Sequence, residues 1–275
     1  MDHRILVPID FTEITENALK YAIGAAKSLE TGINLLHIAE NETKKITSME
    51  ALEALIYKHE GHGVSLKAHT RVGNIYDDIA AAAEELGAGI IFMGTHGMKG
   101  LQRIFGSHAL KVITSSKVPF VITQDKIPAD NEINDIVVPI DMASEDKQIL
   151  TSVIRSSHAF NAKVHLFVNK RKDEFHENAV ARNLAFSKKY LSDHEVNYTV
   201  SHTNEMDTFD RELIRFSQNI GADMVAIVNH HEGGLTNLLG SSFDQHVITN
   251  DARIPVLITN AVDNTKVDDI FGVFK

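Results

Sequence analysis

Short apolar runs alternate with longer amphipathic stretches along the first 124 residues of this 275-residue chain. The runs have the length of buried strands, and the longer stretches repeat apolar residues at helical spacing, as at Ala18, Ala22, Ala25 and Leu29. The expected strands are Ile5–Ile9, Ile33–Ile38, Val64–Thr70, Ile90–Met93 and Pro119–Ile122, and the expected helices are Ile14–Leu29, Ile46–His59, Tyr76–Leu86 and Ser107–Thr114. This alternation predicts an α/β fold whose parallel sheet is covered by helices on both faces.

The second half of the chain repeats motifs of the first. Arg4–Asp10 returns as Asp135–Asp141, and Val118–Thr123 returns as Ile254–Thr259. Asp10 and Asp141 lie 131 positions apart, a period that indicates a duplicated domain rather than a solenoid. We therefore expect domains at 1–124 and 135–260, with a linker at 125–134 and a C-terminal tail at 261–275.

A proline stands at the start of the last expected strand in each half, at Pro119 and Pro255. Proline is tolerated best at a strand start and at a sheet edge. The two last strands are therefore candidates for pairing with each other across the halves. The alternative is that other elements cap the two edges separately.

Composition narrows the class of protein. The formal net charge of -10 argues against a nucleic-acid partner, because no basic field would attract a polyanion. Cysteine is absent, which excludes disulfides and thiolate metal sites. No apolar run reaches the roughly 18 residues of a membrane span, and the N-terminal run is too short for a signal peptide. These features suit a cytoplasmic protein.

The segment from Gly94 to Ser107 carries the clearest candidate chemistry. It follows an expected strand, contains Gly97 and Gly106, and leads into an expected helix. Glycines let the backbone approach an anion closely, and the unpaired N–H groups at a helix start donate to it. The segment therefore predicts phosphate binding, and with it a nucleotide ligand.

These motifs resemble the universal stress protein family in its tandem two-domain form. The resemblance rests on Val7–Asp10, Leu36–Ile38, Met93–Gly97 and the pair Gly106–Ser107. It implies two flavodoxin-like domains, similar to the adenine-nucleotide alpha-hydrolase fold, each with a five-stranded parallel sheet. It also implies a cytoplasmic stress-response protein that binds ATP or another adenine nucleotide, with or without Mg²⁺. Pairing of the two domains through their last strands follows from the same resemblance, while a homodimer of chains stays open.

The resemblance also assigns roles to single residues. Asp10 would contact the nucleoside at the end of the first strand, and Ile38 would flank the adenine. Gly94 and Gly97 would admit the ribose and phosphates. The phosphates would then be held at the helix start. The complete expected cofactor-binding set is Pro8, Ile9, Asp10, Ile38, Met93, Gly94, Gly97, Gly106, Ser107 and His108.

The chain departs from the family pattern in two places. Only eight residues, Met98–Phe105, separate Gly97 from Gly106 where the family has nine. This shorter loop either weakens triphosphate binding or is absorbed through Gly100. In the second half, Val228 and His231 occupy the positions of the first two glycines. Because such side chains obstruct a close backbone approach, we expect no ATP binding of the family type there.

Three functions remain open on the sequence alone: a nucleotide-binding regulatory module, a slow ATPase, and a scaffold whose second domain takes a protein, metal or lipid partner. No Walker lysine motif and no catalytic residue are identified. The histidine-rich stretch around His230 and His231, followed by Asp244 and His246, is compatible with zinc, but adjacent side chains need not converge. We expect a solvated polar loop there and no resident metal.

Overall fold

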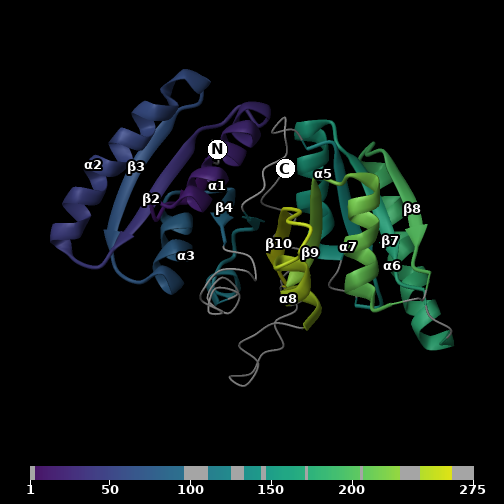
Figure 1. Cartoon of the computed structure of the whole chain (residues 1–275). Helices are drawn as coiled ribbons and strands as arrows, with labels where there is room; N and C mark the ends of the chain where they lie inside the picture. Colours follow the sequence, from purple (N-terminus) through teal and green to yellow (C-terminus); the bar gives the residue numbers. More distant parts are fainter. Residues whose placement is uncertain are drawn as a thin grey trace.

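The computed structural model describes residues 4–95, 111–124, 133–143, 147–170, 173–204, 207–229 and 242–261. Its centre is a ten-stranded sheet in the order β3-β2-β1-β4-β5-β10-β9-β6-β7-β8. The strands are β1 Ile5–Pro8, β2 Ile33–Ala39, β3 Leu66–Val72, β4 Ile90–Gly94, β5 Phe120–Thr123, β6 Asp135–Ile140, β7 Lys163–Val168, β8 Tyr198–His202, β9 Met224–Asn229 and β10 Val256–Asn260. The predicted α/β class is confirmed. Figure 1 shows the two halves side by side, with β10 (yellow) at their junction.

The sheet is mostly parallel, as expected. Within the first half, β1 pairs in parallel with both β2 and β4, so that Ile5 lies beside Ile33 and Ile90. Within the second half, β6 lies between β7 and β9 in the same way, with Ile136 beside Val164. Successive side chains of a strand point to opposite faces, and nearly all strand residues in the middle of the sheet are buried.

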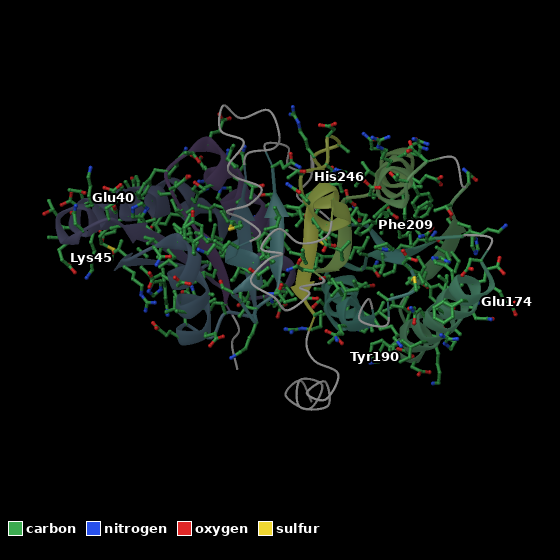
Figure 2. All side chains as sticks on the ribbon, turned by 90° about the horizontal axis from the view of Figure 1, so that it is seen from below. Glu40, Lys45, Glu174, Tyr190, Phe209 and His246 are labelled. Carbon is green, nitrogen blue, oxygen red and sulfur yellow. The ribbon has the colours of Figure 1, made fainter. Side chains whose placement is uncertain are left out.

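Helices cover both faces of the sheet. One core cluster joins α1, α2, α5 and α6 to one face, and a second joins α3, the helical residues 111–114, α7 and α8 to the other. Each core runs across both halves of the chain. The helices are α1 Glu13–Ser28, α2 Glu42–His59, α3 Ile75–Glu85, α5 Ile149–Phe160, α6 Glu174–Asp193, α7 Phe209–Ile220 and α8 Ser242–Ile248, with a short 3-10 turn at Glu60–His62. Glu40 and Lys45, next to the start of α2, lie at the opposite end of the molecule from Glu174 of α6 (Figure 2).

Several boundaries differ from the sequence prediction, most by one residue, and the larger differences are at the start of α2 and at both ends of β3. Helix α2 begins one turn before the predicted Ile46, because the side chain of Asn41 accepts the Lys44 N–H at 2.9 Å and caps an earlier start. Ile46 itself is 66% exposed, so this apolar residue does not lie on the buried face of the helix and was a poor guide to the helix start. Strand β3 ends at Val72 and not at Thr70, because it stays paired with β2 as far as Ala39.

The halves meet through β5 and β10, which pair in antiparallel fashion. Val121 lies opposite Leu257, with Ile122 opposite Val256 and Phe120 opposite Ile258. All six side chains are almost fully buried. The five strands of one half are thereby joined to the five of the other in a single sheet.

A buried phenol gives a first test of the core. Tyr21 of α1 is 1% exposed, packs edge-on against Phe92, and its hydroxyl has no hydrogen-bond partner among the described residues. An unsatisfied buried hydroxyl costs about 1–3 kcal/mol. We therefore expect Tyr21→Phe to raise the free energy of unfolding by about 1 kcal/mol in urea denaturation. A loss of stability in this variant would show that the hydroxyl has a partner after all.

A buried histidine makes stability depend on pH. His59 of α2 is 4% exposed, and its Nε2 lies 3.6 Å from Glu16 Oε1. Burial lowers the pKa of His59, against the opposing effect of the Glu16 carboxylate. The unfolded chain takes up a proton near pH 6.5 and the folded chain only at lower pH, so the free energy of unfolding falls as pH drops below about 6.5.

Replacing the imidazole isolates this contribution. His59→Leu should reduce the fall in unfolding free energy between pH 7 and pH 5, measured by urea denaturation at each pH. The exposed neighbour His62, whose ring centre lies 5.5 Å away, provides the control His62→Gln, which should keep the wild-type slope. Equal slopes in all three proteins would contradict the assignment to His59.

Candidate functional site

A hollow at one edge of the sheet gathers the described members of the predicted site. It occupies about 660 Å³ with its open mouth included. Its lining comes from the ends of β1, β2 and β4, the starts of α1 and α3, and the helix that ends at 114. The lining residues are Pro8, Ile9, Asp10, Thr15, Leu36, His37, Ile38, Ile75, Ile79, Met93, Gly94, Thr95 and Val112.

The position of the hollow follows from the strand order. From β1 the chain proceeds outward to β2 and β3 on one side, then returns to β4 on the other side. The carboxyl ends of β1 and β4 therefore part at a topological switch point, the place where open parallel sheets bind ligands. Asp10 follows β1, and Thr95 follows β4.

Asp10 is held by the first turn of α1. Its Oδ1 accepts hydrogen bonds from the Thr12 backbone N–H at 3.0 Å, from the Thr12 hydroxyl at 2.6 Å and from the Thr15 hydroxyl at 2.9 Å. Thr12 is also the N-cap of this helix. The carboxylate thus fixes the helix start, and its position beside the hollow is rigidly defined.

His37 is a site residue that the sequence analysis did not single out. Its Nδ1 lies 2.7 Å from the Ile9 carbonyl oxygen. A carbonyl only accepts, so Nδ1 carries the proton and donates. The ring also packs against Phe11 at 4.8 Å between centroids, and Phe11 has a left-handed φ of 64°. This contact holds β2 to the turn between β1 and α1.

Gly94 has a packing reason to be glycine. A Cβ built there would lie 2.7 Å from the Ile14 carbonyl oxygen and 2.9 Å from the Ile14 Cγ2. The start of α1 therefore packs directly on the end of β4. The close approach that the sequence suggested for a ligand at this position is made by the protein's own helix.

Part of the predicted phosphate loop lies outside the described residues. This applies to Gly97, Gly106, Ser107 and His108. The chain enters the loop from Thr95, whose N–H donates to the Thr123 carbonyl at 2.8 Å. It leaves the loop through the helix that brings Val112 into the hollow.

Six lining residues besides His37 were not predicted: Thr15, Leu36, Ile75, Ile79, Thr95 and Val112. Ile75 and Ile79 are one turn apart on α3 and could have been found as its inward-facing pair. Leu36 shares a face of β2 with Ile38 and could also have been found. Thr15 and Val112 come to the hollow through the packing of helices against the strands.

The second half has a corresponding hollow with a different lining. It occupies about 640 Å³ with its mouth included and is lined by Pro139, Asp141, Met142, Ala143, Ile149, Phe209, Ala226, Ile227, Val228 and Phe243. Val228 stands where the first half has Gly94. Gly94 lies four residues after Ile90, which pairs with β1, and Val228 lies four residues after Met224, which pairs with β6. The described chain resumes at residue 147, and α5 begins at Ile149, whose counterpart Ala18 lies inside α1.

Asp141 is conserved in position between the halves but has other partners. Its Oδ1 receives hydrogen bonds from His176 Nε2 and the Met142 N–H, each at 2.8 Å, and its Oδ2 receives one from Asn169 at 3.0 Å. His176 is 6% exposed. An imidazole and an amide thus replace the two hydroxyls that hold Asp10.

The histidine-rich stretch around His230 and His231 lies outside the described residues. The nearby His246 pairs with a neighbouring helix, its Nδ1 lying 2.6 Å from Asp210 Oδ2. Burial would raise the pKa of Asp210, but hydrogen bonds from Thr208 and His246 outweigh it and lower the pKa. Within the described part of the chain, no three histidine or carboxylate side chains are grouped to hold a metal.

Comparison with known proteins settles the family. The model of the universal stress protein family matches residues 1–124. A universal stress protein of Methanocaldococcus jannaschii is 30% identical over 158 residues, which cover 46% of this chain and 97% of that protein. The chain belongs to the universal stress protein family. The resemblance found in the sequence is confirmed.

A solved universal stress protein supports the fold over nearly the whole chain. One from Archaeoglobus fulgidus covers 95% of this chain and 100% of its own, with a TM-score of 0.78 at 18% identity. Another from the same organism, solved in complex with dAMP, covers 44% of this chain and 98% of its own, with a TM-score of 0.38 at 21% identity. Within the described residues of this universal stress protein, no helix is long and apolar enough to cross a membrane.

The packing at Gly94 can be tested directly. Gly94→Ala should lower the free energy of unfolding by about 1–3 kcal/mol in urea denaturation, because the new methyl group overlaps the backbone of α1. The control is Gly61→Ala, where a Cβ meets no atom within 4 Å, and its stability should change by less than about 0.5 kcal/mol. Equal effects of the two substitutions would mean that the start of α1 adapts.

Proposed function

We propose that the first half of the chain binds an adenine nucleotide, ATP foremost, and that the protein serves as a nucleotide-binding regulatory module in the stress response. The hollow at the β1/β4 switch point carries this proposal. It lies where parallel sheets bind ligands, and it brings together Pro8, Ile9, Asp10, Ile38, Met93 and Gly94.

The lining suits a flat base at the inner end of the ligand. Ile38, Ile75, Met93 and Val112 contribute apolar surface, and Asp10 contributes a carboxylate. Pockets for small ligands commonly combine apolar walls with a few fixed polar groups. In this arrangement Ile38 flanks the adenine, and Asp10 accepts a hydrogen bond from the nucleoside.

The phosphates would extend toward the glycine loop. The sequence supplies Gly97 and Gly106 for close backbone approach, and Ser107 with the His108 amide at the helix start. Lys99 and Arg103 are the cations nearest to this loop in the sequence. A Mg²⁺ ion would bind through the phosphate oxygens, as it does with nucleotides in general.

Binding is favoured over hydrolysis by the chemistry of the hollow. Among the described residues that line it, Asp10 is the one carboxylate, and three donors at the start of α1 already bind its Oδ1. The His37 Nδ1–H is used by the Ile9 carbonyl. Among the described lining residues, this leaves the Nε2 of His37 as the one uncommitted basic atom, and no second group orients it toward the hollow through a printed hydrogen bond. We therefore propose that the ligand acts by shifting a conformational population that a partner recognises.

Thermal unfolding with and without millimolar Mg-ATP tests the proposal, with AMP and GTP as comparison ligands. ATP at about 100 times its dissociation constant stabilises the native state by about 2.7 kcal/mol, which raises the melting temperature by several degrees. We expect this shift for ATP, a smaller one for AMP, and none for GTP.

Matched glycine variants locate the site. Gly106→Val should abolish the shift, whereas Gly240→Val, at the corresponding position of the second half, should preserve it. No shift in the wild-type protein with any nucleotide would overturn the proposal. A shift that survives Gly106→Val would place the nucleotide elsewhere.

A further inference from the structure

Two amide side chains cross the junction between the halves in a reciprocal manner. Gln124, just after β5, donates from Nε2 to the Asn250 carbonyl at 3.0 Å, beyond the end of α8. Asn260, the last residue of β10, donates to carbonyls at the end of the helix that closes at 114. Each half therefore holds the last helix of the other.

The Asn260 contact is the tighter of the two. Its Nδ2 donates to the Ile113 carbonyl at 2.5 Å and to the Ser116 carbonyl at 2.7 Å, so that both amide hydrogens are used. The last carbonyls of a helix have no partner within the helix itself. Asn260 supplies these partners from the second half.

A second amide orients Asn260. Asn229, at the end of β9 and fully buried, donates from Nδ2 to Asn260 Oδ1 at 2.8 Å. This bond fixes which end of the Asn260 amide faces the helix. The corresponding residue of the first half is Thr95, whose hydroxyl donates instead to the Thr123 carbonyl at 3.5 Å.

The helix held by Asn260 contributes one side chain to the hollow. Val112, which lines it, directly precedes Ile113. On the other side, the Ser115 hydroxyl donates to the Tyr76 carbonyl at 2.9 Å, at the start of α3, whose Ile75 also lines the hollow. The helix end is thus fixed between α3 and the second half of the chain.

We propose that Asn260 is a positioning residue for the nucleotide site of the first half. It acts through the carbonyls of Ile113 and Ser116 and sets the helical residues 111–114, whose Val112 lines the hollow, so the second half helps to position a site that it does not line. This inference rests on the proposed function. It gives the second half a role in ligand affinity even without a nucleotide of its own.

The reciprocal contact provides a matched control. Asn260→Leu and Gln124→Met each remove one amide from the junction while keeping similar side-chain volume. In isothermal titration with Mg-ATP, Asn260→Leu should bind at least about fivefold more weakly than the wild type, and Gln124→Met should bind with wild-type affinity. Hydrogen exchange of the ligand-free proteins should quicken at 111–116 in the first variant and at 245–250 in the second.

The outcomes separate the two proposals. If the wild-type protein binds no adenine nucleotide, the proposed function fails and this inference fails with it. If the wild type binds and the two variants lose affinity equally, or neither loses any, Asn260 serves only to join the halves and the inference is overturned. Unchanged hydrogen exchange at residues 111–116 in the ligand-free Asn260→Leu variant would overturn the inference independently of any nucleotide.

Discussion

The antiparallel pair of β5 and β10 is the constraint on which the rest of the structure depends. Without it, each half would end in an apolar strand with unpaired backbone groups, a surface that promotes aggregation. The pairing centres on Val121 opposite Leu257 and buries both strands almost completely. It also makes the two hydrophobic cores continuous across the halves.

The antiparallel pairing also decides where the two hollows lie. Strands within a half are parallel, so their carboxyl ends share one edge of the sheet. Across the junction the direction reverses, and the carboxyl end of β10 lies beside the amino end of β5. The end of β10 therefore meets the last helix of the first half, which makes the contact of Asn260 with Ile113 sterically available.

The sequence predicted the α/β class and the family because apolar strands and repeated motifs are local signals. It also indicated Asp10, Ile38 and Met93, which line the hollow together. It missed His37 and Val112, since their positions depend on how β2 and a distant helix converge. The start of α2 was misplaced because the cap at Asn41 outweighed the apolar pattern.

Glycine and valine at equivalent strand positions show how the two halves of the chain differ. Gly94 permits α1 to begin against β4, and this places Thr12 and Thr15 on the Asp10 carboxylate. In the second half Val228 takes that position, and Asp141 is held by His176 and Asn169 instead. The next residue, Asn229, contacts Asn260 at the junction. The segment of the second half that lacks the glycines therefore supplies Asn229, and Asn229 orients the amide that holds the helix of the first half.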